Sequence, residues 1–125
     1  MSTLTEFRDS FNKLNDLLRE MVKNKATADQ MGKFTGEYVQ ENLGNSPYLA
    51  MCSGDAADLL KGGLSFDETL KRFKALDQET RVVICLLQEM TQLTGEGHSD
   101  FRPQDHRETL DNGAKVLAAM KEIIQ

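Results

Sequence analysis

Apolar residues recur at three- and four-residue steps along most of the chain, which is the spacing that places them on one face of an α-helix. In the first stripe, Leu4, Phe7 and Phe11 begin a pattern that continues to Met21. Similar stripes predict helices over residues 4–23, 28–42, 66–76, 78–94 and 103–124. No segment alternates as a half-buried strand does, so we expect an all-α fold.

Capping signals stand at several of the expected helix starts. A capping box needs Ser or Thr followed three positions later by Glu or Gln, and the chain has three such pairs: Thr3 with Glu6, Thr27 with Gln30, and Ser65 with Glu68. Asp77 precedes the next helix, and Pro103 marks the start of the last one. Shorter helices are expected over residues 47–52 and 56–61. The expected architecture is therefore a single-domain irregular bundle, residues 1–125, with five to seven helices and short ones in the middle.

The helix expected at 78–94 is apolar all the way round between Val82 and Leu87. Such a helix is enclosed by others, so we place it at the centre and interpret Cys85 as a small core residue. Gly113 falls on the inner stripe of the last helix. Gly32 and Gly36 share one face of the second helix, where we expect another helix backbone to approach closely.

Composition narrows the function classes. The chain has 125 residues and a net charge of −5, with no strongly basic stretch, so direct nucleic-acid contact is not expected. It also lacks an apolar run long enough to cross a bilayer. Its two cysteines form no disulfide framework. We expect an acidic, soluble, cytoplasmic protein that contacts no membrane.

Candidate metal ligands gather in residues 98–108, which hold both histidines: His98, Asp100, Asp105, His106 and Glu108. Helical ligands need separations of three or four residues to share a face, and this segment offers one usable pair. We therefore expect a polar connection joined to a helix start, with no metal, no cofactor and no catalytic residue.

The leading hypothesis is a small soluble accessory factor that acts by protein–protein interaction without catalysis, such as an inhibitor, an immunity protein, an antitoxin-like neutraliser or a chaperone. One alternative is a metal- or thiol-dependent enzyme that uses the 98–108 segment or Cys52. Another is a structural homo-oligomer, in which Leu17, Val22 and Val116 widen the apolar stripes into a subunit contact.

Two connections supply the predicted protein-binding residues. Residues 95–102 contain an aromatic side chain in a polar loop, and residues 45–52 contain a tyrosine, an amphipathic anchor. The candidates are Tyr48, His98, Asp100, Phe101 and Arg102. The competing interpretation is that each loop docks onto its own domain.

Overall fold

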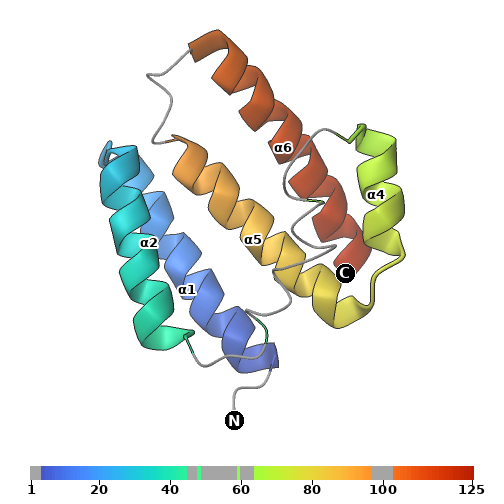
Figure 1. Ribbon diagram of the computed structural model, residues 1–125, viewed down its shortest axis with the longest axis horizontal. Helices are drawn as coiled ribbons and strands as arrows, with labels where there is room; N and C mark the ends of the chain where they lie inside the picture. Colours follow the sequence, from blue (N-terminus) through green and yellow to red (C-terminus); the bar gives the residue numbers. More distant parts are fainter. Residues whose placement is uncertain (1–3, 45–47, 49–58, 60–63, 97–102) are drawn as a thin grey trace.

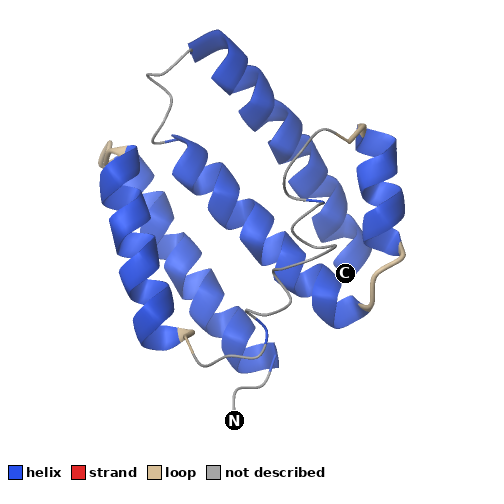
Figure 2. Cartoon of the chain, in the orientation of Figure 1, coloured by secondary structure: helices blue, strands red, loops and turns tan. Residues whose placement is uncertain are grey.

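The computed structural model describes residues 4–44, 48, 59, 64–96 and 103–125, without the side chains of 96, 103–107 and 109. This part of the chain contains five helices and no strand, which confirms the all-α prediction for it (Figure 2). The helices are α1 (Leu4–Lys23), α2 (Ala28–Asn42), α4 (Phe66–Lys74), α5 (Gln78–Glu96) and α6 (Pro103–Ile124).

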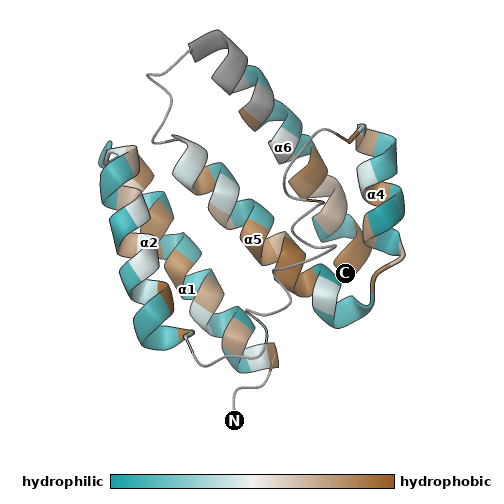
Figure 3. Ribbon diagram, in the orientation of Figure 1, coloured by the Kyte–Doolittle hydropathy of each residue, from teal (hydrophilic) through white to brown (hydrophobic). Residues whose placement is uncertain are grey.

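Helix α5 lies between α1 and α6 in the fold (Figure 1). It packs against α1, α2 and α6, while α4 packs against α6. Residues 82–87 of α5 are all buried, as their apolar sequence predicts, and Figure 3 shows this strongly hydrophobic stretch. Because α5 is buried on every side, it contributes side chains to the core on its α1 side and on its α6 side.

Two hydrophobic clusters meet at α5. The first joins α1, α2 and α5, and its largest fully buried side chains are Phe7, Phe11, Leu14, Leu18 and Met31. The second joins α4, α5 and α6 around Phe73, Ile84 and Met120. Burying each such side chain stabilises the fold by about 1.5–3 kcal/mol, so the two clusters together fix the three helices that pack on α5.

The predicted capping box is complete at Thr27, whereas at Ser65 only the serine half is present, because the Glu68 carboxylate accepts from Arg72. The Gln30 backbone N–H donates to Thr27 Oγ1 at 3.2 Å, and the Thr27 N–H donates to Gln30 Oε1 at 2.9 Å, which completes a capping box. Ser65 Oγ accepts from the Glu68 N–H at 3.1 Å. Thr3 lies outside the described residues. These side chains satisfy backbone donors that the first helical turn leaves without partners.

The glycines divide into two groups. A Cβ added at Gly113 would overlap Gln92 Oε1 and lie 3.1 Å from Gln88 Nε2, so this glycine lets α6 approach α5, as expected. The same prediction is wrong for Gly32 and Gly36, because nothing lies within 4 Å of a Cβ added at either position. Both glycines face solvent on α2.

Some predicted burial is also corrected. The apolar spacing that predicts a helix over residues 66–76 also places Phe66 on its inner face. That placement is wrong, because Phe66 is 46% exposed, whereas Thr69 is buried. Phe66 is the first residue of α4, whereas Leu70 and Phe73 further along the helix pack in the second cluster. Val22 and Val116 are partly buried against the chain's own clusters, and their place in a subunit contact stays a prediction. Leu17 remains 39% exposed.

Candidate functional site

An open groove of about 490 Å³ crosses α5 between α1 and α6. Its floor comes from α5 and the end of α6, where Val82, Cys85, Leu86 and Ile124 line it. Charged and polar side chains line its walls: Arg8, Asn12, Asp16 and Arg19 from α1, Glu89 from α5, and Lys121 from α6. We call this the α1/α5/α6 groove.

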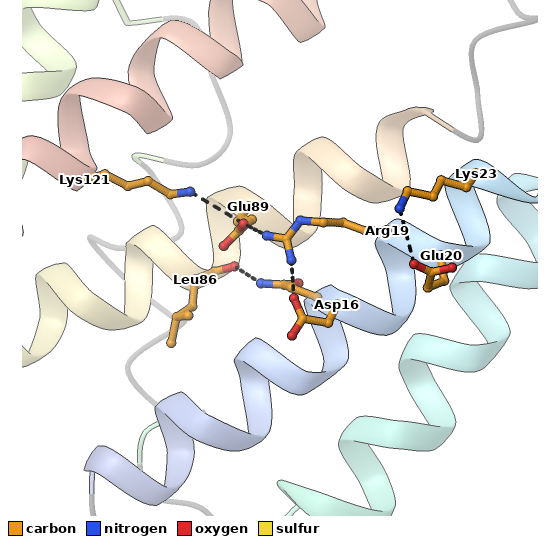
Figure 4. A network of polar contacts seen from close by, with 8 residues as sticks. Asp16, Arg19, Glu20, Lys23, Leu86, Glu89 and Lys121 are labelled. Atoms are coloured by element: carbon orange, nitrogen blue, oxygen red, sulfur yellow. Dashed lines mark hydrogen bonds and ion pairs between the residues drawn. The ribbon is translucent and has the colours of Figure 1, made fainter.

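An ion-pair network joins the three helices at one end of the groove (Figure 4). Glu89, whose side chain is only 12% exposed, accepts a hydrogen bond from Arg19 and lies 3.5 Å from Lys121 Nζ. Arg19 also donates to Asp16. A nearly buried carboxylate requires such cationic partners, so Glu89 holds α1 and α6 in a fixed relation across α5.

Arg8 and Asn12 behave differently from this network. Both side chains are exposed on α1 and lie one helical turn apart on the groove wall. Within the described part of the chain, the network residues pair with one another, whereas Arg8 and Asn12 make no side-chain hydrogen bond or ion pair. Their donors are therefore available to an occupant of the groove.

Asn15 is a fully buried polar residue beside the groove. Its Nδ2 donates to the Leu86 carbonyl oxygen at 3.4 Å, which is a long hydrogen bond. Its Oδ1 has no hydrogen-bond partner among the described residues. Leaving a buried acceptor unsatisfied costs about 1–3 kcal/mol. The contact ties α1 to α5 directly beneath the charged network.

Cys85 forms part of the groove floor but is poorly suited to nucleophilic chemistry. It is a free thiol, 4% exposed, in agreement with the core role predicted for it. Burial raises the pKa of the Cys85 thiol, and the nearby Lys121 charge opposes that change. Since the thiolate is the reactive form, this cysteine is held as an unreactive thiol.

None of the predicted binding residues is among the described residues that line this groove. Tyr48 packs on the chain's own core, with its ring centroid 5.6 Å from that of Phe7, so it helps to close the first cluster. His98, Asp100, Phe101 and Arg102 lie outside the described residues, as does Cys52. Their role in binding a partner stays a prediction.

Most of the predicted metal ligands also lie outside the described side chains; Glu108 is described, and it is exposed. His106 belongs to α6, but its side chain is outside the description. Among the described side chains, no three His, Cys, Asp or Glu residues gather in a way that would hold a metal ion.

One residue of the groove, Glu89, could have been singled out from the sequence. Glu89 follows Val82, Cys85 and Leu86 on one face of α5, at the separations that align residues along a helix. It is an acidic residue on an otherwise buried stripe. A charge in that position calls for cationic partners from neighbouring helices, and Arg19 is one of them.

No helix within the described ranges has both the length and the apolar character needed to cross a bilayer. Comparison of the chain with models of protein families, with curated proteins and with solved structures finds no match.

Proposed function

We propose that the protein is a small accessory factor that binds another protein, acts without catalysis, and uses the α1/α5/α6 groove as its contact surface. An inhibitor, an immunity or antitoxin-like neutraliser, or a chaperone would fit this description. The observation that carries the proposal is the groove itself: a narrow apolar floor flanked by charged side chains. Specific protein interfaces have the same organisation, an apolar centre with a polar rim.

The network around Glu89 supports this proposal because it fixes the walls of the groove before any partner arrives. Arg19 and Lys121 approach the same carboxylate from opposite sides. Ordering side chains at an interface costs roughly 0.5–1.5 kcal/mol for each long side chain. A groove whose walls are already ordered avoids part of that cost.

We also propose the number of helices and the cellular compartment. We take the chain to be a single-domain irregular bundle, in which residues 45–63 add up to two short helices to the five described. The cytoplasm is the proposed compartment, and the free Cys85 thiol is consistent with reducing conditions.

Occlusion of the groove tests the proposal without altering charge. Asn12→Trp places a bulky ring on the groove wall, and Gln40→Trp makes a matched change on the exposed face of α2. Tagged wild-type protein and both variants are used for affinity capture from the native host, with quantitative mass spectrometry. The captured protein is then purified and its Kd for each variant is measured.

We expect a partner that wild type and Gln40→Trp retain and that Asn12→Trp loses. Equal retention by both variants, with folding confirmed by circular dichroism, would show that the groove is not the contact surface.

A further inference from the structure

We infer that the partner segment in the α1/α5/α6 groove presents a carboxylate to Arg8 and Asn12, next to an apolar side chain that covers the floor. This inference rests on the proposed function and specifies the chemistry of the partner. It follows from the way in which the charges of the groove are already distributed.

Among the described residues, the groove walls carry three cationic and two anionic side chains. Asp16 and Glu89 both have cationic partners, and Arg19 and Lys121 are those partners. The excess charge therefore lies at Arg8, which is exposed and makes no ion pair in the described part of the chain. An occupant with a negative group complements that position, whereas a basic occupant is repelled.

The geometry of donors at this position favours a carboxylate. A guanidinium presents a planar fork of N–H donors that matches the two oxygens of a carboxylate. Asn12 lies four residues further along the same face of α1, so its carboxamide provides a further N–H donor within one turn. Arg8 and Asn12 together offer N–H donors to a carboxylate from the α1 wall of the groove.

The floor beside Arg8 is apolar. Val82 and Leu86 come from α5, and Ile124 comes from α6. A carboxylate alone would leave this floor covered by water, so the occupant also carries an apolar group adjacent to its acid. Small-molecule sites bury most of their ligand's surface, and this groove is open. A protein segment therefore suits it better than a free aliphatic acid.

Selection from a random peptide library displayed on phage tests the inference on the whole protein. Enriched peptides are synthesised with blocked ends, and their affinities are measured by fluorescence polarisation for wild type, Arg8→Glu, Lys33→Glu and Asn12→Trp. Lys33→Glu is a matched control, because Lys33 is exposed on α2 and does not line the groove. Octanoate is added as a competitor.

The expected peptides pair Asp or Glu with a neighbouring apolar residue. Their affinity falls at least about tenfold in Arg8→Glu, the loss of one charge-assisted hydrogen bond, and is unchanged in Lys33→Glu. If Arg8→Glu unfolds, Arg8→Gln takes its place and a smaller loss in the same direction is expected.

Several results would overturn the inference: no enriched peptide, enriched peptides without acidic residues, equal binding by Arg8→Glu, or displacement of the peptide by octanoate. Peptides that Asn12→Trp excludes but Arg8→Glu still binds would refute the acidic partner while leaving the groove as a protein-binding surface. Peptides insensitive to both variants would refute the inference and the proposed function together.

Discussion

Replacing Glu89 by Gln removes one charge from the centre of the ion-pair network while keeping the shape of the side chain. Glu89 is only 12% exposed, and it accepts from Arg19 and lies 3.5 Å from Lys121. The substitution leaves an amide facing two cations. We expect Glu89→Gln to lower the free energy of unfolding.

The magnitude follows from the exposure of the three side chains. A hydrogen bond to a charged group contributes about 1.5–3 kcal/mol when it is well shielded. Here the partners Arg19 and Lys121 are 42% and 48% exposed, so both can turn toward water once Glu89 is neutral. The free energy of unfolding should therefore fall by an amount at or just below the lower end of that range, about 1–2 kcal/mol.

Glu20→Gln is the matched control. Glu20 pairs with Lys23 at 3.4 Å on the solvent face of α1, where both side chains are more than half exposed. Exposed pairs of this kind contribute about 0.2–1 kcal/mol. Urea unfolding of both variants, followed by circular dichroism, gives the comparison. A Glu89→Gln loss no larger than that of Glu20→Gln would refute the view that this network fixes the groove walls.

Three further predictions concern the rest of the fold. Gly36→Ala should raise the free energy of unfolding by about 1 kcal/mol, because helix propensity improves and nothing obstructs the new methyl group. Gly113→Ala should show no such gain in the same thermal or urea unfolding, because the methyl overlaps Gln92 and disturbs its 2.7 Å bond to the Leu110 carbonyl oxygen; equal gains would contradict the packing described. Cys85 should react slowly with a thiol reagent at neutral pH until the protein is unfolded, since burial raises its pKa; rapid reaction of the native protein at this residue would be the contrary result. Hydrogen bonds from the Thr80 side chain and backbone, and the Arg81 charge, lower the pKa of Asp77. Its contribution to stability is therefore present above the ordinary Asp pKa of about 3.9 and is lost as the pH falls toward the lower folded value. Asp77→Asn should lose less stability than wild type on acidification, and an identical pH profile would contradict this.

The helices were predictable because their signals are local. Apolar spacing gave the bounds of α1 and α6, and capping residues such as Thr27 lie within three positions of the groups that they bond. Burial of α5 followed from the absence of polar residues between Val82 and Leu87.

The groove was not predictable in the same way, because it depends on how three helices meet. Arg8 and Lys121 are far apart in the sequence, and each alone resembles an ordinary charged surface residue. Glu89 stands out on its apolar stripe, but no local signal shows which cations meet it. Close packing at the glycines also depends on how the helices meet. Gly113 and Gly36 look alike in sequence, and only the position of a neighbouring helix decides which one permits close packing.

The proposed function depends on a partner protein binding in the α1/α5/α6 groove. Its most direct test is the Kd of the captured partner for wild type, Asn12→Trp and Gln40→Trp, all confirmed as folded. We expect Asn12→Trp to weaken binding at least about tenfold, equivalent to 1.4 kcal/mol or more, while Gln40→Trp binds as wild type does. The same Kd for all three proteins would contradict the claim.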